Sequence, residues 1–144
     1  ALTGIKWTNE VPKGNYEVAL EASKLSGSDF FCGLTFPVGD ASCTFVVGGW
    51  GGGVVGISSI DGSDASMNET TRYLEFAKNR WYRIRARVTS EKIACWIDDE
   101  QVVDVEHKGR KISMRPGEIE MSEPFGIATW QTTGALRKIR IRKL

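Results

Sequence analysis

The chain has 144 residues, which suits one domain and is enough to bury a core without disulfides or metals. Its 19 basic and 18 acidic side chains give a net charge of +1, whereas a general nucleic-acid binder is usually strongly basic. No apolar run of about 18 residues occurs, so we expect no membrane span. The single histidine, His107, excludes a multi-histidine metal centre.

The charge is divided unevenly along the chain. Residues 1–70 hold 3 basic and 8 acidic side chains, whereas residues 71–144 hold 16 basic and 10 acidic ones. This indicates either a basic binding face or strands from the two halves that lie side by side with their charges paired. We favour the second interpretation, because exposed charges on neighbouring strands usually pair.

The chain begins with Ala1-Leu2-Thr3-Gly4, which contains neither an initiator Met nor a charged leader. We therefore expect residues 1–144 to form one domain taken from a longer chain, with flanking domains among its partners. The missing signal peptide then carries no information about where the longer chain acts.

Hydrophobic residues recur with a period of two along most of the sequence, which is typical of half-buried strands. For example, Tyr16, Val18 and Leu20 alternate with Glu17 and Glu21. Strands are predicted over residues 16–22, 30–36, 42–47, 54–58, 81–88, 92–97, 101–106, 125–130 and 136–144. The one helical candidate, residues 68–78, contains too many Thr and aromatic residues to favour a helix.

About ten short strands separated by regular turn signals predict an antiparallel β-sandwich. If the last strand pairs with the strand over residues 16–22, its basic side chains meet Glu17 and Glu21. That pairing would also bring the two ends of the chain into one sheet.

The three cysteines cannot all pair with one another. Cys32 and Cys43 lie in a predicted hairpin whose turn spans residues 38–41. Counting outward from that turn places them out of register for a disulfide bond. We therefore expect both, and Cys95, to be buried free thiols.

Gly48-Gly49-Trp50-Gly51-Gly52-Gly53 is the most unusual stretch of the sequence. It does not predict a phosphate-binding loop, because neither a Gly-Lys-Ser/Thr ending nor a helix follows it. Glycines allow a close approach to the backbone, and a Trp ring offers a flat apolar face on which a sugar ring can stack. The alternative is a bulged turn with Trp50 in the core. Trp130, beside Gln131 at a strand end, presents the same alternatives.

Residues 58–72 form a polar segment about as long as loops in compact domains become without a function. Its side chains suited to sugar hydroxyls, as acceptors or donors, are Asp61, Asn68, Glu69 and Arg72. We expect no cofactor. The one alternative is Ca²⁺ held by Asp61, Ser63 and Asp64, although their spacing departs from the Asp-x-Asp-x-Asp-Gly pattern of calcium loops.

Arg83, Arg85 and Arg87 lie on one face of a predicted strand, with Trp81 and Trp96 expected beside them. Such a row suits a polyanion. We favour an exposed outer sheet, in which Arg stems pack on Trp rings and Arg head groups pair with carboxylates. A concentrated nucleic-acid site would also raise the net charge, so we expect no nucleic-acid partner.

Glycoside hydrolysis needs two carboxylates that face one cleft. The sequence lacks the Glu-x-Asp-x-x-Glu strand by which jelly-roll glucanases place such a pair. Glu118 and Glu120 share a face only if their segment is extended. The pattern therefore identifies no catalytic residue.

Four stretches of the sequence together point to a known family. They are the strand Asn79-Arg80-Trp81-Tyr82-Arg83-Ile84-Arg85, the hairpin from Lys92 to Asp104, the strand Phe31-Cys32-Gly33-Leu34-Thr35-Phe36, and the ending Phe125 to Trp130 followed by Leu136 to Ile141. Over roughly residues 15–144 the chain resembles the 3-keto-disaccharide-hydrolase-like domain of the concanavalin A-like lectin/glucanase superfamily.

This resemblance implies an all-β, two-sheet antiparallel jelly-roll sandwich whose concave side faces carbohydrate. In active members it implies cleavage of 3-keto-glycosides. Two features depart from the family pattern. Phe-Cys replaces the family's Asn-Ser before Gly33, and the chain is too short for the long insertions that build the family's cleft.

We therefore predict a carbohydrate-binding or interaction module of a larger exported protein, periplasmic or on the cell surface. The predicted ligand contacts are Trp50 and Trp130 for stacking, with Asp61, Asn68, Glu69 and Arg72 as polar contacts. The alternatives are an enzyme that cleaves 3-keto-glycosides, with Asp61 or Glu69 as the base, and a structural spacer.

Overall fold

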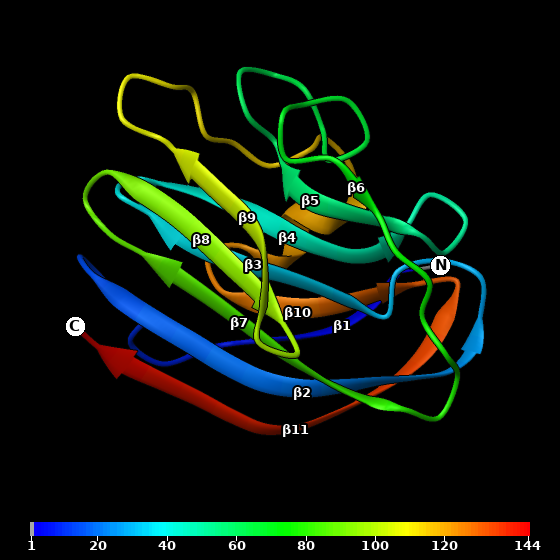
Figure 1. Cartoon of the computed structure of the whole chain (residues 1–144). Helices are drawn as coiled ribbons and strands as arrows, with labels where there is room; N and C mark the ends of the chain where they lie inside the picture. The colour runs from blue at the N-terminus through cyan, green and yellow to red at the C-terminus, as the bar shows by residue number, and fades with distance from the viewer. Residues whose placement is uncertain (1) are drawn as a thin grey trace.

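The computed structural model describes residues 2–144, which form two antiparallel sheets packed face to face (Figure 1). The elements in chain order are β1 (Leu2–Lys6), β2 (Tyr16–Gly27), β3 (Cys32–Val38), β4 (Ala41–Gly49), β5 (Val54–Ser58), β6 (Arg72–Tyr73), β7 (Trp81–Val88), β8 (Lys92–Ile97), β9 (Glu100–Glu106), the 3-10 helix η1 (Glu118–Ser122), β10 (Gly126–Trp130) and β11 (Thr132–Lys143). The predicted all-β jelly-roll sandwich is confirmed.

The six-stranded sheet has the order β1-β10-β3-β4-β5-β6, and the five-stranded sheet has the order β11-β2-β7-β8-β9. The predicted pairing of the last strand with β2 is confirmed, since Arg142 lies opposite Glu17 and Arg137 opposite Glu21. The expectation that both chain ends share a sheet was wrong. The N-terminal strand β1 pairs with β10 in the other sheet, and the termini lie at opposite ends of the sandwich (Figure 1).

Two short edge strands, β1 and β6, were not predicted, because their five and two residues carry no period-two pattern long enough to detect. No helix forms over residues 68–78, which contain turns and β6. The only helical element described within residues 2–144 is η1. Glu118 and Glu120 therefore lie on a 3-10 turn and not on an extended segment.

The core lies between the two sheets and is built by alternation along each strand. In β7, Tyr82, Ile84, Ala86 and Val88 are buried, while the residues between them face outward. Burial of a large apolar side chain contributes about 1.5–3 kcal/mol each, so this alternation fixes the register of the sheet. The predicted thiols Cys32, Cys43 and Cys95 are buried and free.

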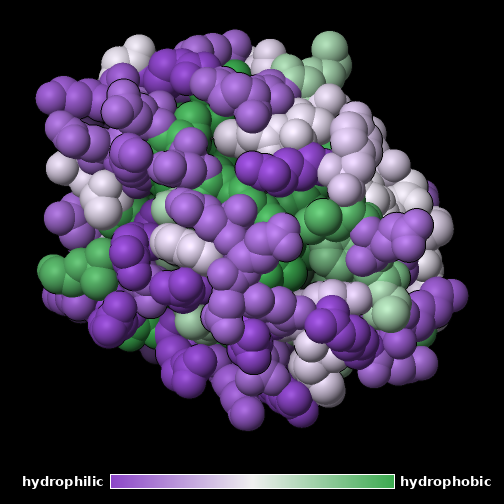
Figure 2. All heavy atoms as spheres, in the orientation of Figure 1, coloured by the Kyte–Doolittle hydropathy of each residue, from purple (hydrophilic) through white to green (hydrophobic). Residues whose placement is uncertain are grey.

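Salt bridges on the outside of the five-stranded sheet join the acidic first half of the chain to the basic second half. The pairs are Glu17 with Arg85, Arg87 and Arg142, and Glu21 with Arg137 and Lys138. The guanidinium carbon of Arg85 also lies 4.0 Å from the ring centre of Trp96. The interpretation of this face as paired charges on packed Arg stems is thereby confirmed. Figure 2 shows hydrophilic residues over most of the surface in this view.

The six-stranded sheet differs, because β3, β4 and β5 are buried at nearly every position and so on both faces. Residues 58–72 cover part of its outer face. A Cβ atom at Gly56 would lie 2.9 Å from Oγ1 of Thr70, which shows how closely this loop packs on β5. The segment after β9 joins the loop through paired backbone hydrogen bonds between Ser59 and Ser113. In Figure 1 both segments rise at the top of the view.

Candidate functional site

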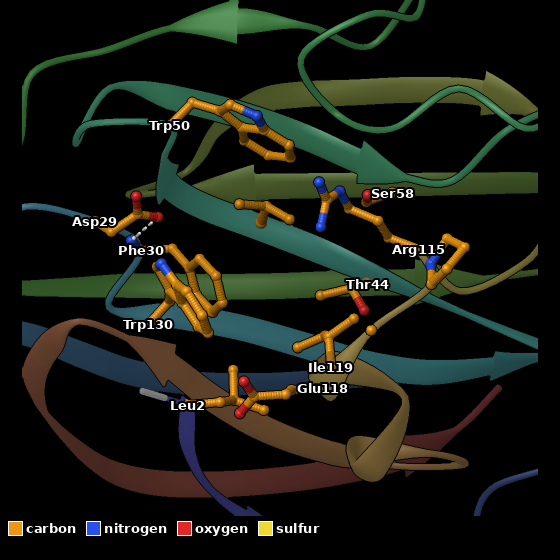
Figure 3. Close-up of a pocket in the computed structure, with 13 residues that line it drawn as sticks. Leu2, Asp29, Phe30, Thr44, Trp50, Ser58, Arg115, Glu118, Ile119 and Trp130 are labelled. Atoms are coloured by element: carbon orange, nitrogen blue, oxygen red, sulfur yellow. Dashed lines mark hydrogen bonds between the residues drawn. The ribbon is translucent and has the colours of Figure 1, made fainter.

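A pocket of about 500 Å³ lies on the outer face of the six-stranded sheet, beside the segment after β9 (Figure 3). The sheet contributes the floor residues Leu2, Thr44, Val46, Ser58 and Trp130. Loops contribute Asp29, Phe30 and Trp50, together with residues 115–119. These positions alternate with core residues along their strands, so the side chains that line the pocket point away from the sandwich interior.

Trp50 sits at the tip of the β4–β5 hairpin. The N–H of Gly52 donates to the carbonyl of Gly49 at 3.1 Å, and the two residues between them have φ of 47° (Trp50) and 91° (Gly51). These are the features of a type I′ turn, which favours Asn and Gly. Trp50 is 42% exposed and lines the pocket, so it is not tucked into the core. A bulky aromatic residue at positive φ is unusual and points to a functional constraint.

Trp130 ends β10 and lies opposite Leu2 of β1, so both side chains share the outer face. Its backbone N–H donates to the carbonyl of Phe30 at 3.2 Å. Figure 3 shows the indole rings of Trp50 and Trp130 at one end of the pocket and Ser58 at the other, with the guanidinium of Arg115 between Ser58 and Trp50. The structure therefore brings the two predicted aromatic residues together around one cavity.

Asp29 joins the turn that carries Trp50 to the connection that carries Phe30. Its Oδ1 accepts the N–H of Phe30 at 2.8 Å, and its Oδ2 accepts the N–H of Gly51 at 3.3 Å. Both oxygens of the carboxylate are thus engaged by backbone donors from the β2–β3 and β4–β5 connections. Asp29 is a positioning residue of the pocket.

The predicted polar contacts Asp61 and Glu69 lie outside the pocket lining. Arg110 donates from Nε to Asp61 at 2.6 Å and from Nη1 to Glu69 at 2.7 Å. The backbone N–H of Lys111, together with Arg110, lowers the pKa of Asp61, and the hydrogen bonds from Arg110 lower the pKa of Glu69. Both carboxylates are held in the ionised form, in which they tie the 58–72 loop to the segment after β9.

Asn68 and Arg72, the other two predicted polar contacts, also lie outside the pocket lining. Nδ2 of Asn68 donates to the carbonyls of Ile57, Ser63 and Asp64 at 2.7–3.0 Å, so the amide organises its own loop. Nε of Arg72 donates to the carbonyl of Val102 at 2.8 Å, across to the other sheet.

Within residues 2–144, no group of three or more His, Cys, Asp or Glu side chains is placed to hold a metal ion. Asp64, one of the residues considered for Ca²⁺, accepts hydrogen bonds from Ser66 and Arg115. Partial burial raises the pKa of Asp64, but these hydrogen bonds outweigh the burial and lower the pKa overall.

None of the helical structure described for residues 2–144 is long and apolar enough to cross a membrane.

Sequence reasoning missed the side chains of Phe30, Ser58 and Arg115 in the pocket. Ser58 carried no distinctive signal, since it is one of many hydroxyl residues in a polar segment. For Arg115 the one available indication was the Arg-Pro-Gly sequence at 115–117. Pro and Gly break strands, so they mark this segment as a loop that can pass over the sheet.

Solved structures with similar folds include galectin LEC-6 of Caenorhabditis elegans, with TM-score 0.58 and 10% identity over 98% of this chain and 89% of that one. The carbohydrate-binding module CBM66 of Bacillus subtilis has TM-score 0.55 and 11% identity over 98% of this chain and 91% of that one. An alginate lyase of Corynebacterium sp. has TM-score 0.53 and 12% identity over the whole of this chain, which spans 62% of the lyase. At these identities the likeness shows the shared fold.

A comparison with curated proteins found no match. A comparison with protein-family models matches residues 4–142 to the 3-keto-alpha-glucoside-1,2-lyase-like domain. The match covers nearly the whole chain and confirms the resemblance drawn from the four sequence stretches. The chain therefore belongs to the 3-keto-alpha-glucoside-1,2-lyase-like domain family.

Proposed function

We propose that this chain is a carbohydrate-binding module that holds a saccharide in the pocket on the outer face of the six-stranded sheet. The observation that carries the proposal is the pair of indole rings of Trp50 and Trp130 around one open cavity. Apolar sugar faces stack on such rings, and a few polar groups then fix the orientation. The fold shared with a galectin and with CBM66 supports the same proposal.

The backbone of Trp50 adds a second argument. A non-glycine residue at φ 47° costs stability, and such strain persists where function requires the side chain. Asn-Gly would suit this turn better than Trp-Gly. A half-exposed indole in this strained turn is therefore a reason to assign Trp50 to ligand contact.

The predicted polar contacts fit this proposal in a revised role. Asp61, Asn68 and Glu69 organise the 58–72 loop, which starts at the pocket residue Ser58, and Arg115 reaches the ligand from the segment after β9. The affinity should be modest, because two stacked rings and a few hydrogen bonds leave a small surplus over the costs of binding. We place the module in a larger exported protein, as the family resemblance implies.

The test compares Trp50→Asn with wild type by calorimetric titration against a panel of oligosaccharides. Saccharide affinity should fall about tenfold or more, while the free energy of unfolding should rise by roughly 1 kcal/mol as the turn strain is relieved. Trp81→Ala is the matched control, because it removes an indole from the outside of the five-stranded sheet and should leave binding unchanged. Unchanged binding in Trp50→Asn would contradict the proposal.

The second candidate is an enzyme acting on 3-keto-glycosides, which the description of the matching family favours. Asp61 and Glu69 suit the role of base poorly, since the backbone N–H of Lys111 and then Arg110 lower the pKa of Asp61, and Arg110 lowers that of Glu69. Among the carboxylates that line the pocket, Asp29 is occupied by backbone donors, which leaves Glu118. Turnover of a 3-keto-glycoside that is lost in Glu118→Gln would support this candidate. The third candidate, a spacer, predicts neither binding nor turnover.

A further inference from the structure

We infer that the saccharide bound in this pocket carries an anionic substituent, and that Ser58 and Arg115 bind that group. This inference rests on the proposed function, because it concerns the chemistry of the ligand at the same site. Hydrogen-bonding capacity remains unused at the part of the pocket that Ser58 and Arg115 line, next to Trp50.

Ser58 carries a buried hydroxyl with no hydrogen-bond partner among residues 2–144. The residue is 2% exposed and lines the pocket at the end of β5, opposite Thr44 of β4. Thr44 by contrast shares a 2.8 Å hydrogen bond with Thr35. Buried polar groups in native proteins nearly always have partners, so an orphaned hydroxyl beside a cavity calls for one from outside the chain.

Arg115 offers further unused donors beside Ser58. Its Nε donates to Asp64 at 3.4 Å, while neither terminal nitrogen has a hydrogen-bond partner among the described residues. The side chain is 53% exposed, and Figure 3 shows the guanidinium directed into the pocket next to Ser58. Arg110, in the neighbouring ion cluster, instead uses Nε and both terminal nitrogens at 2.6–2.8 Å.

This part of the pocket therefore presents an unpartnered buried hydroxyl together with guanidinium donors that no protein group uses. Arg115 is the one basic side chain among the residues that line the pocket. A guanidinium binds a planar or branched oxyanion through two parallel hydrogen bonds, which a neutral hydroxyl cannot match. The guanidinium carbon also lies 5.8 Å from the ring centre of Trp50, so a sugar stacked on Trp50 would bring a ring substituent within reach. A carboxylate or a sulfate ester on the sugar supplies this chemistry.

The experiment titrates the protein with matched oligosaccharides that share a backbone and differ at C6, as neutral glucans, as their C6-carboxylates and as their C6-sulfates, in several linkages. Wild type should bind an anionic form about tenfold or more tightly than its neutral counterpart, and the preference should weaken with added salt. The carboxylate and sulfate arms identify which oxyanion fits.

In Arg115→Gln the anionic and neutral forms should bind equally. In Ser58→Ala the affinity for the anionic form should fall several-fold with no loss in Tm, whereas a purely structural hydroxyl would change Tm alone. Arg83→Gln is the control, since Arg83 pairs with Asp99 on the far sheet and should leave the preference intact. Equal binding of neutral and anionic sugars by wild type would overturn this inference and leave the proposed function standing. No binding to any member would overturn both.

Discussion

The ring of Phe30 lies directly over Gly33, so that a Cβ atom at Gly33 would come within 2.7 Å of Cε1 of Phe30. Phe30 packs against Val46, Val54 and Ala65 and lines the pocket. The substitution Gly33→Ala should push the ring toward the cavity. We expect a loss of roughly 1–3 kcal/mol in unfolding free energy and weaker saccharide binding, measured by urea denaturation and titration.

The double variant Gly33→Ala/Phe30→Leu provides the control for this contact, because the smaller side chain leaves room for the new methyl group. The double variant should lose less unfolding free energy than the two single variants lose together, as expected for residues in direct contact. Strict additivity of the two substitutions would show that the ring does not constrain Gly33.

Asn68 should act as a structural residue of the 58–72 loop. The substitution Asn68→Asp removes the amide donor to three carbonyls and places a negative charge among them. We expect the unfolding free energy to fall by roughly 2 kcal/mol or more, measured by chemical denaturation. Met67→Ala, at an exposed neighbouring position, should change it little. An unchanged unfolding free energy in Asn68→Asp would contradict this assignment.

The Arg110 cluster should make stability depend on pH in the acid range. Asp61 and Glu69 have pKa values lowered in the folded state from ordinary values of 3.8 and 4.5. A lowered folded pKa contributes stability that is present above the unfolded pKa and lost as pH falls through the folded one. The Tm of Arg110→Gln should therefore lie below that of wild type at about pH 6, and the gap should close toward about pH 3.

Arg83→Gln serves again as the comparison in that series, since its ion pair with Asp99 is largely exposed and contributes little. A constant Tm gap between Arg110→Gln and wild type across the acid range would show that the two carboxylates are not the cause.

The three thiols should be inert in the folded protein. Burial raises the pKa of all three and brings that of Cys32 to about 12, so almost no thiolate is present at neutral pH. A thiol reagent should label no cysteine in native protein and all three in denaturant, as counted by mass spectrometry. Rapid labelling of native Cys95 would show that the five-stranded sheet opens locally.

The match between sequence and structure is best where one face of a strand is buried. In β7, Tyr82 and Ile84 alternate with Arg83 and Arg85, and the period of two reports directly on burial. It is poorest where both faces are covered or the element is short. The strand β6 has two residues, and its place beside β5 depends on the loop before it.

The candidate site was likewise predicted only in part. The glycine-flanked Trp50 and the strand-end Trp130 could be selected from their chemistry, since a flat apolar ring near a turn suits a sugar. Their assembly around one cavity could not, because residues 50 and 130 meet only through the order β10-β3-β4 in the six-stranded sheet. Arg115 likewise reaches the pocket only because its segment crosses the sheet beside Ser59.

By itself the sequence determined the sandwich, the free thiols and the pairing of acidic β2 with basic β11, since each follows from side-chain alternation and register within neighbouring strands. Tertiary structure alone decided which polar residues face the pocket. In the folded chain Asp61 and Glu69 bind Arg110, whereas Ser58 and Arg115 keep free donors. Packing and not local sequence determines which hydrogen-bond partners far apart in the chain meet.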